Sequence, residues 1–197
     1  MGDRTEDRSI VDLAREYLRK KYDKPGQVFV GVVHRLDRPV SGVLLLARTS
    51  KGASRLSEQF RQRQVRKIYH CLVEGRPPKV AGELTDHLAK QSASNVSRVV
   101  ESDDDAAKLA RLKYRVLRSV RGRTLLEVEL LTGRSHQIRV QLASRGMPIC
   151  GDIKYGSRTR LSGWMALHAG SLTFEHPTRA EPITVVAPEP AEWQRFL

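Results

Sequence analysis

The 197-residue sequence has little that would suit a membrane or an oxidising compartment. Its longest purely apolar run is VLLLA, Val43 to Ala47, far shorter than the ~20 residues that a transmembrane helix needs. The N-terminal segment MGDRTEDRSIVDLAREY lacks the apolar core of a signal peptide. There are only two cysteines, Cys71 and Cys150, and they lack metal-ligand spacing. We therefore expect a protein of the cytoplasm, without a membrane segment.

Several common kinds of catalytic site are also missing from the sequence. The histidines show no paired short spacing and no cysteine cluster lies near them, which argues against a zinc site. Neither a Walker-type phosphate loop nor a dinucleotide fingerprint is present, and Ser41 lacks the flanking glycines of a nucleophile elbow. We expect no metal, no nucleotide cofactor and no serine hydrolase.

Positive charge, by contrast, is abundant. The net charge is +13 and the isoelectric point is about 10.3, which favours a nucleic-acid partner. Arginine supplies 25 of the 35 basic residues, and its planar guanidinium suits bidentate phosphate recognition and stacking on bases. A high genomic GC content would give the same arginine excess, so charge alone leaves the choice open.

Helical and strand-like patterns alternate in the first third of the chain. Apolar spacing predicts a helix over Ser9 to Tyr22, with Ser9 as its cap, that ends at Pro25-Gly26. Two buried strands are expected on either side of the polar loop HRLDRPVSG, over 28–33 and 43–47. A helix with a basic outer face should follow over 51–63, capped by Ser50.

The rest of the chain is typical of a sheet. We expect strands over 67–73 and 165–174, a hairpin of 112–116 and 126–130 around Arg121-Gly122, a helix from about His136 to Arg145 that Gly146 ends, and a short helix over 190–197. The polar stretch 77–105 predicts short strands and mobile loops, as an insertion loop would have. The sequence thus indicates one domain, 1–197, of class α/β or α+β, with a mixed sheet covered by helices.

The loop HRLDRPVSG holds a carboxylate among basic groups. Asp37 lies between Arg35 and Arg38 and close to His34, on a loop between strands, where reactive residues often lie. The same aspartate could instead bond backbone amides or pair with an arginine. Local pattern alone leaves both alternatives open.

Two further segments carry side chains suited to a site. In LLTGRSHQIR, Gly133 and Arg134 precede a helix whose first turn could face an anion, although a capped helix start with solvated polar residues would have the same pattern. Tyr69, in the strand KIYHCLV, could stack on a base, although a lone strand tyrosine is more often part of the core.

Taken in order, these segments resemble the RluA family of pseudouridine synthases. The blocks are HRLD-x-x-x-SG, KIY, L-x-TGRSHQIR, GD-x-x-YG and LHA-x-x-L-x-F-x-HP, and they run from about Val32 to Pro177. The resemblance implies the pseudouridine synthase fold, with a largely antiparallel mixed sheet flanked by helices and loops. It also implies an RNA isomerase that converts uridine in rRNA or tRNA to pseudouridine without a cofactor.

The resemblance further implies roles for individual residues. Asp37 would be the nucleophile, Tyr69 would pack against or act on the target base, and Arg134 would pair with the Asp37 carboxylate through two hydrogen bonds. Arg35 would help to hold the uridine flipped out of the RNA, and His34 and Ile138 would contact the RNA. A glycosidase would need a second catalytic carboxyl group, which the blocks do not supply.

The sequence departs from the family at two points. An earlier block of the type N-K-P-x-G is not found, so we expect a catalytic domain shortened at its N-terminus, and Val40 stands where the family often has threonine. Two alternatives from other classes are a catalytically inactive RNA-binding module and a non-specific basic protein of the ribosomal type. We expect the chain to be a monomer.

Overall fold

The computed structural model describes residues 8–23, 25–91, 94–179 and 181–196. Three α-helices and two 3-10 helices are formed by α1 (Ile10–Tyr22), α2 (Ser50–Arg61), α3 (Gln137–Ala143), η1 (Ile153–Tyr155) and η2 (Ala191–Arg195). The strands are β1 (Gly31–Val32), β2 (Ser41–Gly42), β3 (Leu46–Ala47), β4 (Arg66–Glu74), β5 (Ala81–Gln91), β6 (Val96–Val100), β7 (Lys108–Val120), β8 (Arg123–Leu130), β9 (Leu167–Glu175) and β10 (Pro182–Val186). No helix in these ranges is long and apolar enough to cross a bilayer.

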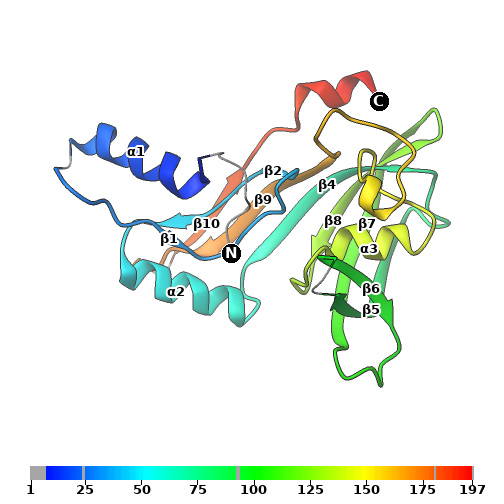
Figure 1. The fold of residues 1–197 in the computed structure, drawn as a ribbon, viewed down its shortest axis with the longest axis horizontal. Helices are drawn as coiled ribbons and strands as arrows, with labels where there is room; N and C mark the ends of the chain where they lie inside the picture. The colour runs from blue at the N-terminus through cyan, green and yellow to red at the C-terminus, as the bar shows by residue number, and fades with distance from the viewer. Residues whose placement is uncertain (1–7, 24, 92–93, 180, 197) are drawn as a thin grey trace.

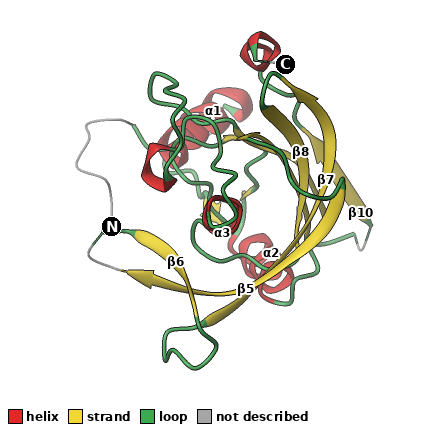
Figure 2. Cartoon of the chain, turned by 90° about the vertical axis from the view of Figure 1, so that its right-hand side faces the viewer, coloured by secondary structure: helices red, strands yellow, loops and turns green. Residues whose placement is uncertain are grey.

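A large curved sheet organises the molecule (Figure 1). Seven of its eight strands follow the order β10-β9-β4-β8-β7-β5-β6, and all of these neighbours are antiparallel. The eighth, β2, pairs parallel with β9. In Figure 2 the sheet bends around α3, while β1 and β3 form a separate two-stranded pair. The mixed, largely antiparallel sheet confirms the predicted fold class.

The sheet and α3 enclose the main core. Leu72, Leu112, Leu126 and Leu142 are fully buried there. A second cluster, with Leu56 of α2 and Phe174 of β9, lies under α2. A third, smaller cluster is formed by Leu88, Ala110 and Val140, between the sheet and α3.

The predicted elements of the first third need correction in detail. Helix α1 begins after Ser9, whose side chain accepts from the Asp12 amide as predicted. Helix α2 is capped by Thr49 and not by Ser50, because the Thr49 hydroxyl reaches the Gly52 amide at 3.0 Å. The two strands predicted over 28–33 and 43–47 are shorter in the structure, where only the two-residue strands β1 and β3 are formed.

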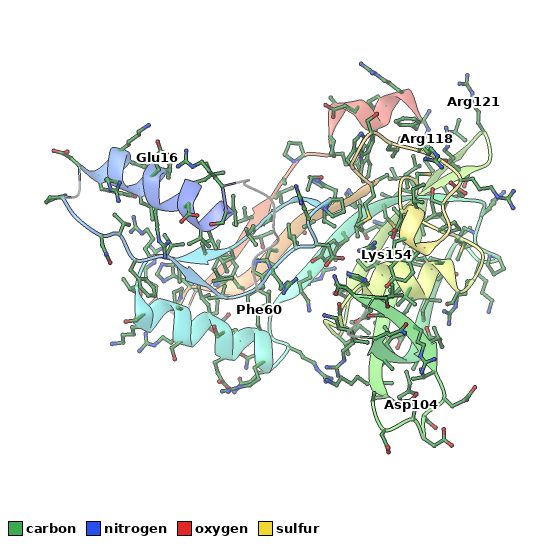
Figure 3. The ribbon with its side chains drawn as sticks, viewed as in Figure 1. Glu16, Phe60, Asp104, Arg118, Arg121 and Lys154 are labelled. Carbon is green, nitrogen blue, oxygen red and sulfur yellow. The ribbon has the colours of Figure 1, made fainter. Side chains whose placement is uncertain are left out.

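The stretch 77–105 holds a short strand, β6, as predicted, but the interpretation of this stretch as an insertion loop is wrong. Residues 81–91 form β5, which lies inside the sheet between β7 and β6, and the loop around Asp104 extends away from the body (Figure 3). Strand β10 was not predicted at all. The predicted C-terminal helix is the 3-10 helix η2, and its predicted last residue, Leu197, lies outside the described residues.

The other elements agree with their sequence patterns. Strands β4, β7 and β8 cover their predicted ranges and extend beyond them, whereas β9 begins two residues after the predicted start and ends one residue after the predicted end. Arg121 and Gly122 both have positive φ, at 51° and 75°, as the tight turn of a two-residue hairpin requires. Helix α3 ends at Ala143, and Gly146 just beyond it has a φ of 72°. These elements place the segments HRLD, KIY and TGRSHQIR around one space.

Candidate active site

A pocket of about 650 Å³ opens between the HRLD loop, β4 and the start of α3, a size typical of ligand sites. Its lining includes all six residues that the sequence singled out: His34, Arg35, Asp37, Tyr69, Arg134 and Ile138. Segments that are far apart in the sequence therefore meet at one place.

The end of the HRLD loop is fixed to β9. Gly42 has a φ of +110°, and a Cβ atom there would lie 2.3 Å from the Ala169 carbonyl oxygen. Only glycine fits this approach. Next to it, Ser41 Oγ lies 2.8 Å from His168 Nδ1. The blocks SG and LHA are thus two sides of one contact that holds the loop against the sheet.

The start of the loop is fixed by His34. Its Nε2 accepts a hydrogen bond from the Leu45 amide at 2.8 Å, and its ring stacks on Phe60, with centroids 4.7 Å apart. Phe60 lies on the side of α2 that faces the strands (Figure 3). Burial, reinforced by the charge of Lys67, lowers the pKa of His34 to about 4. The imidazole is therefore neutral at neutral pH and acts as an acceptor.

Asp37 projects into the pocket with 26% of its side chain exposed. Its Oδ2 accepts from Arg139 Nη1 at 3.0 Å. Arg139 in turn donates Nε and Nη2 to the two carboxylate oxygens of Asp152, at 2.7 and 2.8 Å. The Asp152 side chain is only 1% exposed. One guanidinium thus joins a half-buried carboxylate to a buried one, and the bidentate pair fixes its orientation.

The predicted ion pair between Arg134 and Asp37 is wrong. Arg134 Nε instead donates to the Leu109 carbonyl at 2.9 Å, while Arg139 occupies the position beside Asp37. The reason is geometric, because Arg134 precedes α3 and Arg139 projects from the helix toward Asp37 and Asp152. Arg134 remains in the pocket wall.

His136 forms a second support behind Asp37. Its Nε2 lies 3.8 Å from Asp37 Oδ2, and its Nδ1 lies 2.8 Å from the Tyr155 hydroxyl. That hydroxyl also accepts from the Ser97 amide at 2.8 Å. Burial lowers the pKa of His136, although the negative charge of Asp37 opposes the shift. A neutral imidazole therefore lies beside the carboxylate.

Tyr69 lies in the pocket lining and packs against the main core. Burial, together with the negative charge of Asp37, raises the pKa of Tyr69 to about 12. Its hydroxyl thus stays protonated at neutral pH and can donate a hydrogen bond. A neutral aromatic ring beside a carboxylate is suited to contact a planar base.

The remaining predicted residues also lie in the pocket wall. Arg35 is exposed, whereas Ile138 is 3% exposed and belongs to the main core. Arg139 stands in the block TGRSHQIR, in the helix turn expected to face an anion, but the pairing with Asp37 was predicted for Arg134. Asp152, in the block GD-x-x-YG, was not predicted as a site residue. Among the described residues, no group of three or more His, Cys, Asp or Glu side chains is placed to hold a metal ion.

The chain is similar to known proteins along most of its length. A family model described as RNA pseudouridylate synthase matches residues 4–144. An uncharacterized RNA pseudouridine synthase of Chloroflexus aurantiacus is 40% identical over 175 residues, which cover 87% of this chain and 54% of that protein. Ribosomal large subunit pseudouridine synthase D of Xanthomonas campestris is 37% identical over 181 residues, which cover 85% and 54%.

A solved structure extends the likeness to the fold. Human RNA pseudouridylate synthase domain containing 4 has a TM-score of 0.74 and 26% identity, and the match covers 94% of this chain and 79% of that one. The chain spans about half the length of the first curated relatives that it matches. The resemblance noted in the sequence is confirmed, and the chain belongs to the RNA pseudouridylate synthase family.

Proposed function

We propose that this chain isomerises uridine to pseudouridine in RNA, with Asp37 as the nucleophile. The observation that carries the proposal is the position of the Asp37 carboxylate, which faces a pocket of about 650 Å³ and is held by an arginine that Asp152 fixes from behind. A carboxylate whose orientation is set before the substrate arrives needs little rearrangement to react.

The isomerisation needs no external reactant. The bond between N1 of uracil and C1′ of ribose breaks, the base turns in the pocket, and a bond forms between C5 and C1′. The C5 proton leaves and N1 gains a proton, so the atoms balance without a cofactor. Asp37 would supply the nucleophile, and Tyr69, in the same pocket lining, would hold the ring while it turns. The uridine must first flip out of the stacked RNA, with Arg35 at the exposed pocket edge.

The substrate class that we propose is rRNA or tRNA, acted on in the cytoplasm by a monomeric chain. The net charge of +13 supports binding to a polyanion. The names of relatives such as the large-subunit enzyme of Xanthomonas campestris favour rRNA.

The test is tritium release from RNA labelled at C5 of uridine. We expect release with the purified chain on rRNA or tRNA transcripts, and its complete loss in Asp37→Ala and in the nearly isosteric Asp37→Asn. Binding of the same RNA should persist in both variants, which separates lost chemistry from lost folding. RNA binding by the unmodified chain without any release would instead favour the inactive RNA-binding module.

A further inference from the structure

Lys67 brings an unpaired positive charge into the lining of the pocket. It stands on β4, two residues before Tyr69, and alternation along a strand places both side chains on the same face. Its ammonium lies against the loop before α3, since a Cβ atom on Gly133 would be 3.7 Å from Lys67 Nζ. No hydrogen bond or ion pair to this ammonium is formed by any residue that the structure describes.

The surroundings make this charge costly. Burial and the positive charge of Arg63 both lower the pKa of Lys67, because a partly desolvated ammonium beside another cation is less stable than its neutral form. Arg63 itself has a φ of 60°, a conformation uncommon outside glycine. Strained or unpaired groups of this kind cluster where a ligand is to be bound.

The charged residues of the pocket lining indicate the sign of the charge on that ligand. Asp37 is the carboxylate of the lining, and Arg139 already neutralises it. Of the other cations that line the pocket, Arg61 pairs with Glu58. No carboxylate within the described ranges pairs with the remaining four, Arg35, Arg63, Lys90 and Arg134. The space between them is built for an anion.

We infer that Lys67 binds a phosphodiester group of the RNA next to the flipped uridine. The inference rests on the proposed function, because the phosphate is that of its substrate. With Tyr69 against the base and Lys67 two residues along the same strand, β4 would hold one nucleotide at its ring and at its backbone. An ammonium with three free donors satisfies phosphate oxygens well.

A different role for the same residue makes an opposite prediction. A lysine with a lowered pKa could act as the base that removes the C5 proton. In that case Lys67→Met would leave RNA affinity unchanged and abolish the reaction at saturating RNA. A phosphate contact instead weakens affinity and affects the saturated rate less.

The experiment measures binding of a fluorescein-labelled single-stranded RNA of mixed sequence by anisotropy, at several salt concentrations. For Lys67→Met we expect Kd to rise about 10-fold. The slope of log K against log salt should become shallower by about 0.7, as the loss of one phosphate contact to single-stranded RNA predicts. Lys67→Arg should restore most of the affinity and the slope.

Lys113→Met is the matched control, because it removes one lysine charge from an exposed position on β7 outside the pocket. It should change Kd and slope far less. Removing an unpaired, partly buried charge should also raise the Tm of Lys67→Met, by about 2 to 4 °C. An unchanged slope, or a Tm that falls below that of Lys113→Met, overturns the inference. Since binding is measured without turnover, a chain that binds in this way but releases no tritium would refute the proposed function alone.

Discussion

At the scale of single residues, the two arginines of TGRSHQIR can be told apart by experiment. Arg139 joins Asp37 to Asp152. Arg139→Lys should lower the single-turnover rate at saturating RNA about 10- to 100-fold, because an ammonium cannot form the bidentate pair that a guanidinium forms. Arg134 bonds a backbone carbonyl, so Arg134→Lys should change that rate less than about 3-fold. Equal losses in the two variants would contradict the geometry.

His34 should make the stability of the folded protein depend on pH. Its pKa is about 4 when folded and about 6.5 in an unfolded chain, so the unfolded state binds more protons between these values. Stability should therefore fall as the pH drops from 6.5 toward 4 and change little from this source above pH 7.

The measurement is urea unfolding at pH 7 and pH 4.5. His34→Gln can keep an acceptor near the Leu45 amide without titrating. Between the two pH values the unmodified protein should lose about 2 kcal/mol more than this variant. All other groups are the same in both proteins, so their contributions cancel in the comparison. Identical pH profiles would show that folding does not change the pKa of His34, against the expectation.

The residues of the site were predictable to different degrees. Asp37 and Tyr69 stand in short, distinctive blocks, and both lie in the pocket lining. The partner of Asp37 could not be chosen from sequence, because Arg134 and Arg139 occur in one block and only the placement of α3 decides between them. The role of Lys67 could not be predicted from sequence either, since its lack of a partner is a property of the assembled pocket.

At the scale of elements, β2 is held by a contact that leaves no room for a side chain. Gly42→Ala would push a Cβ atom against the backbone of Ala169 at 2.3 Å. We expect a loss of about 3 kcal/mol or more in the free energy of unfolding, since overpacking adds to the unfavourable φ. The urea midpoint measures this loss.

Gly122→Ala is the control, because Gly122 also has positive φ but open space around it. That variant should lose only about 1 kcal/mol. Equal losses for Gly42→Ala and Gly122→Ala would mean that β2 can move away from β9 at no cost.

The Tyr155 hydroxyl joins three elements, because it bonds the Ser97 amide of β6 and the ring of His136 before α3. Tyr155→Phe should leave both partners unsatisfied and lower the free energy of unfolding by about 1 to 3 kcal/mol. The single-turnover rate should fall as well, since His136 beside Asp37 loses its anchor. Tyr17→Phe on the exposed helix α1 is the control and should change neither quantity.

The elements were predictable where one face is buried and the other polar. Strands β4, β7, β8 and β9 have that pattern or continuous apolar runs, whereas β5 has only Leu84, Leu88 and Ala89 buried among its 11 residues. Its place in the sheet comes from pairing with β6 and β7, which local sequence does not encode. Strand β10 was not predicted for a similar reason, because its apolar side chains are largely exposed.

At the scale of the whole molecule, stability should be unevenly distributed. Helix α1 has no buried residue, and its Ile10, Leu13 and Tyr17 are 54%, 46% and 58% exposed, while β4 and β8 lie in the middle of the sheet. Hydrogen exchange followed by mass spectrometry should show α1 exchanging at a small fraction of the global unfolding free energy. The central strands should exchange only through global unfolding, and protection of α1 equal to theirs would contradict this description.

The parallel contact between β2 and β9 also sets an order of events during synthesis. Asp37 leaves the ribosome early, but its partner Arg139 is synthesised 102 residues later. His168, the partner of Ser41, is synthesised 127 residues after Ser41. At about 5 to 20 residues per second, that delay is on the order of 6 to 25 s. During this interval the nascent chain carries the nucleophile without the groups that orient it, so a polypeptide interrupted before β9 has the HRLD loop but no working site.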